Sequence, residues 1–285
     1  MQEHVVVEKV MSRISEISIG SIKVTALRDG ELVLPTDMLI NLAEDDASTI
    51  AADENNALSQ TNINAHLIRS GDRVMLVDAG ARELFGPTCG FLVDALAEAG
   101  VQPADVTDLF FTHLHPDHVA GALTPEGGAV FENAAVKVLD AERQFWSENS
   151  FDPVEVNGAD WAGLAGAVLG AYAGQVESVA ADAELMPGVT AVGIPGHTPG
   201  HAGFRVDSGA DSLIHLGDIM HVQVMQLIDP RVATIFDVDG EMALASRQRM
   251  LDMVSADQLL CTSGHMLTPK FAHIERSTSG YAVVV

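Results

Sequence analysis

The 285-residue sequence is poor in basic residues, with 15 Lys and Arg against 40 Asp and Glu, and its formal net charge is −25. An acidic surface repels the phosphates of nucleic acids and anionic membranes, so neither is expected as a partner. A neutral or cationic small molecule is more compatible with this charge. Solubility alone would also account for the acidity.

Cysteine and long apolar runs are scarce as well. The two cysteines, Cys89 and Cys261, lie far apart and outside any CxxC pair, which excludes a disulfide framework and a thiolate metal site. The start of the chain lacks the basic region of a secretory signal, and no run approaches the ~18 apolar residues of a membrane span. We therefore expect a cytoplasmic protein, although a signal removed before the printed start, with a periplasmic location, would leave the same sequence.

The sequence does contain enough apolar residues for one large core, with 47% hydrophobic residues and no internal repeat. A single domain over residues 1–285 is predicted, of which residues 1–14 form an N-terminal extension. Alternating apolar and polar residues predict strand hairpins over residues 14–30 and 63–80. Helices are predicted in the middle of the chain and strands return after residue 175. This order indicates an α/β (α+β) fold with two sheets flanked by helices.

The stretch FTHLHPDHVAG, residues 111–121, concentrates ligand-type side chains directly after an apolar strand. His113 and His115 could hold one metal ion, and Asp117 and His118 a second one ~3.5–4 Å away, which is the spacing of two-metal sites. Nitrogen and carboxylate ligands without sulfur suit Zn²⁺, and also Mn, Fe or Co. A histidine-rich surface loop is the alternative, but four such residues at a strand exit favour a metal site.

Three further ligand-type residues also follow apolar strands. His197 lies in GIPGHTPGHAGF, Asp218 in LIHLGDIMH and His265 in LLCTSGHM. The recurrence predicts that all of them meet at one edge of the sheets. The two oxygens of the Asp218 carboxylate could bridge two cations there.

The succession of HxHxDH, GHTPGH, GD and a late GH resembles the metallo-β-lactamase fold superfamily, over almost the whole chain. The resemblance implies a four-layer αββα sandwich with a dinuclear metal site at one edge. It implies one metal subsite made of His113, His115 and His197, and a second made of Asp117, His118 and His265, with Asp218 bridging the two.

The finer pattern is similar to methyl parathion hydrolase and related lactonases, in the stretches LFGPTCG, FWSEN, GDIMHVQV and HMLTPKFAHIERSTSGY. This resemblance implies an apolar substrate pocket lined by Phe85 and Trp146, with His221 nearby. Acyl-homoserine lactonases often carry a tyrosine where this chain has His221, which favours the methyl parathion hydrolase branch. Family members often form dimers, so a homodimer is expected.

Two other residues have supporting roles in the prediction. Asp78, in LVDAG, either orients a ligand histidine or forms a turn before the glycine. His201 is expected to support its loop rather than to bind metal.

The function predicted from these features is hydrolysis of neutral, hydrophobic esters by a hydroxide that bridges two divalent metal ions, with zinc as the preferred metal. The substrates would be organophosphate triesters, aryl esters or lactones, and Asp117 or Asp218 would pass a proton to the leaving group. The alternative within enzymes is an N-acyl-homoserine lactone lactonase. A catalytically silent binding protein on the same fold is the rival from another class.

Overall fold

The structure, a computed structural model, describes residues 12–284 except 157, 159 and 269. Most of the predicted extension over residues 1–14 therefore lies outside the described residues. Its last member, Ile14, is already the first residue of a strand.

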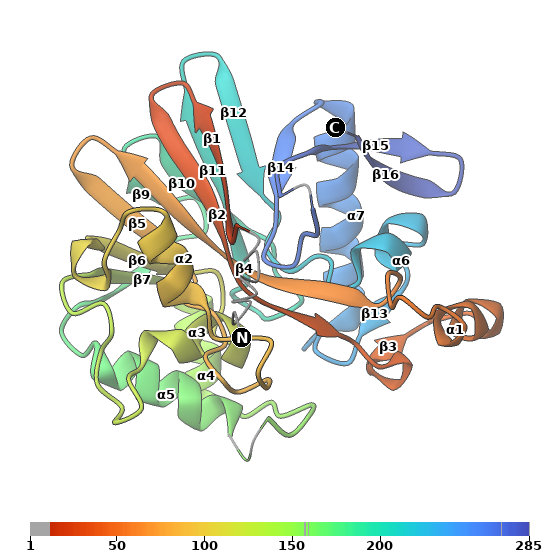
Figure 1. Cartoon of the computed structure of the whole chain (residues 1–285), viewed down its shortest axis with the longest axis horizontal. Helices are drawn as coiled ribbons and strands as arrows, with labels where there is room; N and C mark the ends of the chain where they lie inside the picture. The colour runs from red at the N-terminus through yellow and green to blue at the C-terminus, as the bar shows by residue number, and fades with distance from the viewer. Residues whose placement is uncertain (1–11, 157, 159, 269, 285) are drawn as a thin grey trace, which may run out of the picture.

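Two sheets pack face to face at the centre of the molecule (Figure 1). The larger has seven strands, in the order β1 (Ile14–Ile19), β2 (Ile22–Val33), β4 (Gln60–Ser70), β5 (Arg73–Val77), β6 (Asp108–Phe111), β7 (Ala135–Leu139) and β8 (Val176–Val179). The smaller has five, in the order β14 (Leu260–Thr262), β12 (Asp211–His215), β11 (Ala202–Ser208), β10 (Val189–Gly193) and β9 (Glu184–Met186). Two short pairs complete the strands, β3 (Leu39–Ile40) with β13 (Ala233–Thr234) and β15 (His273–Ser277) with β16 (Gly280–Val284).

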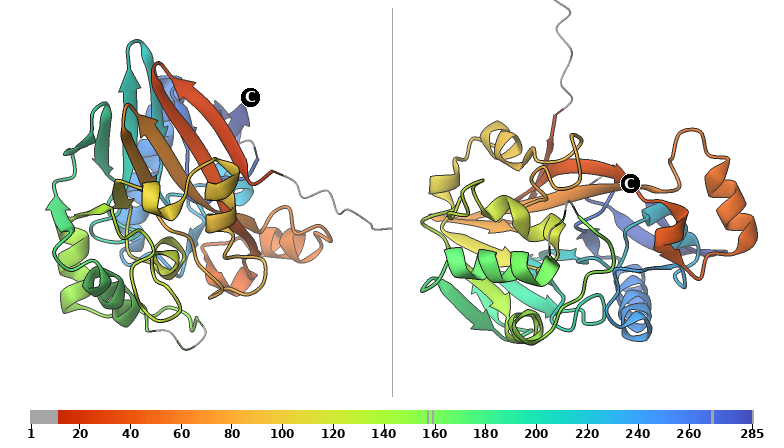
Figure 2. Two further views of the ribbon diagram at one scale, coloured as in Figure 1. Left: turned by 60° about the vertical axis from the view of Figure 1, so that its left-hand side comes forward. Right: turned by 90° about the horizontal axis from the view of Figure 1, so that it is seen from below.

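The helices are α1 (Glu44–Ala51), α2 (Leu92–Glu98), α3 (Pro116–Val119), α4 (Asp140–Glu148), α5 (Trp161–Ala171), α6 (Gln223–Ile228) and α7 (Gly240–Ala256). Helices α2, α4, α5 and α7 lie on the outer sides of the sheets, whereas α1 lies to one side of them, as Figure 2 shows from two further directions. In the part of the chain that the structure describes, no helix combines the length and apolar character needed to cross a membrane. The short elements β3, β9, β13, β15, α3 and α6 were not predicted from the sequence.

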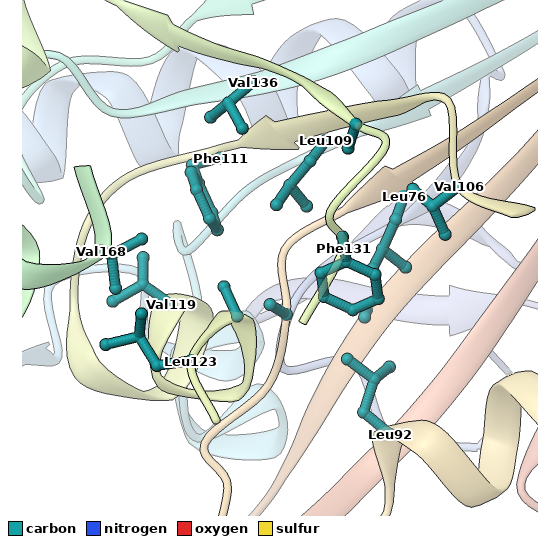
Figure 3. Close-up of a cluster of buried hydrophobic side chains, with 14 of the residues drawn as sticks. Leu76, Leu92, Val106, Leu109, Phe111, Val119, Leu123, Phe131, Val136 and Val168 are labelled. Carbon is teal, nitrogen blue, oxygen red and sulfur yellow. The ribbon is translucent and has the colours of Figure 1, made fainter. Parts of the chain in front are cut away.

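Three apolar clusters separate the layers. Alternate side chains of strand β6 point to opposite faces of the sheet and so contribute to two of these clusters. Phe110 points into the cluster between the sheets, where Phe204 of β11 also lies. Leu109 and Phe111 point to the other face, which α2, α3 and α5 cover (Figure 3). A third cluster joins the outer face of the smaller sheet to α7. The predicted four-layer αββα sandwich is confirmed.

Strand direction explains where polar side chains gather. Strands β5, β6, β7 and β8 run parallel to one another, and β12 runs parallel to β14. The residues that follow β5, β6 and β7 therefore emerge at one edge of the larger sheet, and those that follow β12 and β14 emerge together from the smaller one.

Two further histidines lie in strands and are buried between the sheets. His66 of β4 and His215 of β12 contact each other with ring centroids 4.7 Å apart, and His66 Nε2 lies 2.8 Å from Thr262 Oγ1. Burial, with a smaller effect of Lys270, lowers the pKa of His66 from 6.5 to about 3. His66 is therefore held neutral in the folded protein.

We expect His66→Gln to reduce the loss of stability in mild acid. Because the pKa of His66 is lower in the folded than in the unfolded chain, protons bind the unfolded chain first as the pH falls below 6.5. The free energy of unfolding of the wild type should fall by about 1.4 kcal/mol per pH unit from this group alone, between pH 6.5 and 3. Urea unfolding in a chelator between pH 6.5 and 4.5 measures this difference, and equal slopes for the two proteins would contradict it.

Candidate metal centre

The predicted ligand stretch leaves β6 as a short loop and then becomes helical. His113 and His115 lie in the loop, while Asp117 and His118 lie in α3. Pro116 is the first residue of this helix, a position that suits proline because its φ is already helical and no N–H is needed. The change from loop to helix turns the two pairs of side chains towards different parts of the same centre.

Asp218 is the point on which the imidazoles converge. Its Oδ2 lies 2.8 Å from Nε2 of His265 and 3.0 Å from Nε2 of His118. The same oxygen lies 3.6 to 3.7 Å from the Nε2 atoms of His221, His113 and His197. A Cβ on Gly264 would lie 2.7 Å from Asp218 Oδ1, so glycine is needed for the loop after β14 to pass this close.

The two predicted subsites are both present as groups of neighbouring ligand atoms. In the first, His113, His115 and His197 offer atoms within 4.8 Å of one another, and in the second Asp117, His118 and His265 do the same. Several of these atoms are buried without a hydrogen-bond partner, namely Nε2 of His113, His115, His118 and His197, and Oδ1 of Asp218. Buried polar atoms without partners are costly, so this donor set fits metal ions.

The other ring nitrogens of four of the predicted ligand histidines are held by neighbouring groups, which fixes the direction of these rings. The contacts are His118 Nδ1 with Asp78 at 2.8 Å, His265 Nδ1 with the Asn62 carbonyl at 2.6 Å, His197 Nδ1 with Asp237 at 2.8 Å and His113 Nδ1 with Thr112 Oγ1 at 3.1 Å. Burial, reinforced by the neighbouring imidazoles, holds the pKa of His113 and His115 well below the usual range. Both rings are therefore neutral, as metal ligands must be.

The structure places Asp78 behind a predicted ligand histidine. Its carboxylate accepts hydrogen bonds from the backbone N–H and hydroxyl of Thr112 and contacts His118 Nδ1. Its φ of 61° puts the backbone in the left-handed region directly after β5, and no hydrogen-bonded turn is assigned at this residue.

His201 has no ring nitrogen to spare. Its Nδ1 donates to the Ile194 carbonyl at 2.7 Å, and its Nε2 accepts the backbone N–H of Asp218 at 2.8 Å. His201 therefore fixes the backbone at Asp218 and has no free ring nitrogen for a metal ion.

A small apolar cavity of about 50 Å³ opens beside both subsites. Its lining residues are Leu32, Leu34, Thr61, Phe85, His115, Asp117, Val154, Trp161, His221, Phe236 and His265. Phe85 and His221 thus lie where the sequence placed them. Burial, with His265 and His197 nearby, holds the pKa of His221 well below its usual range, so its imidazole is neutral.

Trp146 does not line this cavity, which corrects the prediction. Its indole lies 4% exposed, and its Nε1 donates to Glu142 at 2.6 Å behind His115. The first residue of α5, Trp161, occupies the wall instead, edge-on to His115 and stacked with Phe236. Helical spacing shows only that both tryptophans lie in helices, and it does not show which one faces the cavity.

Apart from Asp78, the side chains that contact the far ring nitrogens of the predicted ligand histidines were not predicted from the sequence. Asp237 contacts His197 and forms a buried ion pair with Arg247 of α7, 3.4 Å apart. Burial alone would raise the pKa of Asp237, but its hydrogen bond with His197 and the charge of Arg247 outweigh burial and lower the pKa. Asp237 follows no apolar strand of the main sheets, so strand-exit reasoning gave no signal for it.

Comparison with known proteins agrees with this fold. A curated N-acyl homoserine lactonase of Bacillus cereus is 23% identical over 176 residues, which span 61% of each chain. Among solved structures, the dizinc quorum-quenching lactonase AidC superposes with a TM-score of 0.86 at 24% identity, over 95% of this chain and 96% of AidC. The hydrolase AbOPH of the beta-lactamase superfamily superposes with a TM-score of 0.83 at 26% identity, over 97% of this chain and 98% of AbOPH.

The family model of the metallo-beta-lactamase superfamily matches residues 58–265. This range contains all seven predicted ligands, from the loop after β6 to the loop after β14. The chain belongs to the metallo-beta-lactamase superfamily.

Proposed function

We propose that this protein is a dinuclear metal-dependent hydrolase of neutral, apolar esters, and that lactones with an apolar acyl chain are its substrates. One observation carries the proposal. The Asp218 oxygen lies among five imidazole Nε2 atoms, and two of these imidazoles, His221 and His265, line a cavity with mostly apolar walls. When bound, two divalent cations, with zinc as the first candidate, would provide a nucleophile from water at neutral pH and withdraw charge from the ester oxygen.

The residues of the chain divide the remaining work. Asp117 and His221 both line the cavity, whereas Asp218 lies below it. Asp117 is therefore better placed than Asp218 to carry a proton to the leaving alkoxide. The neutral imidazole of His221 can hydrogen-bond to an ester oxygen. The apolar walls exclude water and strengthen these polar interactions.

The substrate class rests on the cavity and on the relatives. Leu32, Leu34, Phe85 and Phe236 offer contacts for an acyl or aryl group. The names of the matched relatives, N-acyl homoserine lactonase and quorum-quenching lactonase, support the lactone. Phosphotriester hydrolysis, as in methyl parathion hydrolase, stays a second candidate, which His221 favours.

A substrate panel tests this proposal. We expect kcat/KM of the zinc-loaded protein to be highest for long-chain N-acyl homoserine lactones, lower for aryl acetates and lowest for paraoxon-type triesters. A preference for triesters would establish the second candidate, and hydrolysis of none of the three by protein with two bound zinc ions would contradict the proposed function.

Phe85→Ala tests the cavity wall. Phe85 is half-buried beside the ligands, and loss of its contact with an acyl chain should raise KM for long-chain substrates about tenfold, which is ~1.4 kcal/mol. Acetyl esters, which are too short to reach it, serve as the matched substrates and should show no change. An equal effect on long and short substrates would show that Phe85 supports the fold rather than the substrate.

A further inference from the structure

A second buried carboxylate, Glu142 of α4, lies close to the candidate centre but is not one of its ligands. Its side chain is fully buried, and each of its two carboxylate oxygens accepts two hydrogen bonds. Oε1 accepts from the Leu114 N–H at 2.9 Å and from Trp146 Nε1 at 2.6 Å. Oε2 accepts from Thr198 Oγ1 at 2.5 Å and from the Gly200 N–H at 3.2 Å.

These four donors come from the two loops that carry the first subsite and from α4 itself. Leu114 stands between His113 and His115, and Thr198 directly follows His197. The second loop is pressed against α4, since a Cβ on Gly200 would lie only 2.1 Å from the Glu142 backbone nitrogen. One carboxylate thus fixes the separation between the loop with two of the histidines and the loop with the third.

The charge of Glu142 has no cationic partner. Hydrogen bonds alone counteract the burial that raises the pKa of Glu142, and no Lys, Arg or His of the described residues forms an ion pair with it. A buried charge is costly unless it is compensated. Histidine binds a metal ion as a neutral ligand, so a cation bound at the first subsite would bring the missing positive charge into this region.

We propose that Glu142 is a positioning residue for the subsite made of His113, His115 and His197. It fixes the position of the two ligand loops relative to each other, and its buried negative charge increases the affinity of that subsite for a divalent cation. The inference rests on the proposed function only in requiring that this subsite binds metal.

The test is the zinc affinity of each subsite in Glu142→Gln, measured by competition with a chromophoric chelator. In a His265→Ala background, which removes a ligand of the second subsite, the affinity reports on the first. In a His115→Ala background it reports on the second. We expect Glu142→Gln to weaken zinc binding at the first subsite by roughly 10- to 100-fold and at the second by less than about threefold. Glu148→Gln, an exposed glutamate on the same helix, is the matched control and should change neither.

A second variant tests the hydrogen-bonded link between the two loops separately from the charge of Glu142. It stays informative even if Glu142→Gln does not fold. Thr198→Val removes one hydrogen bond and keeps the carboxylate, so it should weaken the first subsite by only about threefold to tenfold. Unchanged zinc affinity of the first subsite in both variants, or equal weakening of both subsites by Glu142→Gln, would overturn the inference. Absence of zinc binding by the wild type would instead count against the proposed function.

Discussion

Asp218→Asn should lower kcat/KM for ester hydrolysis by about three orders of magnitude, or ~4 kcal/mol of activation free energy. The carboxylate is buried at 1% exposure, and its Oδ2 is within 4 Å of ligands from both subsites. An asparagine keeps the shape but removes the negative charge. It also turns either an amide N–H₂ or a neutral oxygen towards imidazoles that converge on an anion. Both subsites therefore lose a shared ligand.

The measurement is steady-state hydrolysis of a lactone and an aryl acetate, with the zinc content of each protein determined in parallel. We expect the variant to retain less than two equivalents of zinc. Asp182→Asn, an exposed aspartate in the turn before β9, is the control and should behave as the wild type. Wild-type kcat/KM in Asp218→Asn would show that the bridging assignment is wrong.

Arg247→Met should lower the free energy of unfolding by about 3–5 kcal/mol, since removal of one partner leaves a buried charge uncompensated. Arg247 is fully buried in α7 and pairs with Asp237. Its Nη1 donates to the Pro230 carbonyl at 3.0 Å and its Nε donates to the Ile219 carbonyl. Ile219 directly follows Asp218, so the same side chain ties the helix to the loop that carries the bridging carboxylate.

Urea unfolding of the metal-free proteins measures this effect without a contribution from bound zinc. Arg249→Met is the matched control, because Arg249 is exposed on the same helix and, among the described residues, donates a hydrogen bond only to the Gly193 carbonyl. Its effect should stay within about 0.5 kcal/mol. A similarly small effect of Arg247→Met would mean that the pair with Asp237 contributes little to the fold.

The positions of the ligands could be predicted because each follows an apolar strand. That signal is local, because the residues of a strand either alternate between apolar and polar or are apolar throughout. A ligand-type residue directly after such a stretch can therefore be recognised in the sequence. Parallel strands then bring their exits to one edge, so His113, Asp218 and His265 could be expected to meet although they come from different sheets. Metal binding by these residues stays a prediction, as does the homodimer.

The groups that orient the ligands gave no comparable signal. In the sequence Glu142 is one acidic residue of a polar helix, and Asp237 is one of several aspartates in a loop. Each acquires its role from partners ten or more residues away, such as Gly200 for Glu142 and Arg247 for Asp237. Trp161 rather than Trp146 lines the cavity for the same reason. Which of the two tryptophans faces the cavity depends on how α4 and α5 pack against the loop with His113 and His115.

The residues of the sequence by themselves predicted two sheets flanked by helices and a cluster of nitrogen and oxygen ligands without sulfur, because hydrophobic periodicity and strand exits are local features. The four-layer sandwich and the division of the predicted ligands into two sets were implied by the resemblance to the metallo-β-lactamase superfamily. Only the tertiary structure decided that Asp218 lies among five imidazoles, that Trp161 rather than Trp146 lines the cavity, and that Glu142, which has no ion-pair partner among the described residues, joins the two loops of one predicted subsite. These features depend on distances between segments far apart in the chain, which are set by the packing of whole layers rather than by any local pattern.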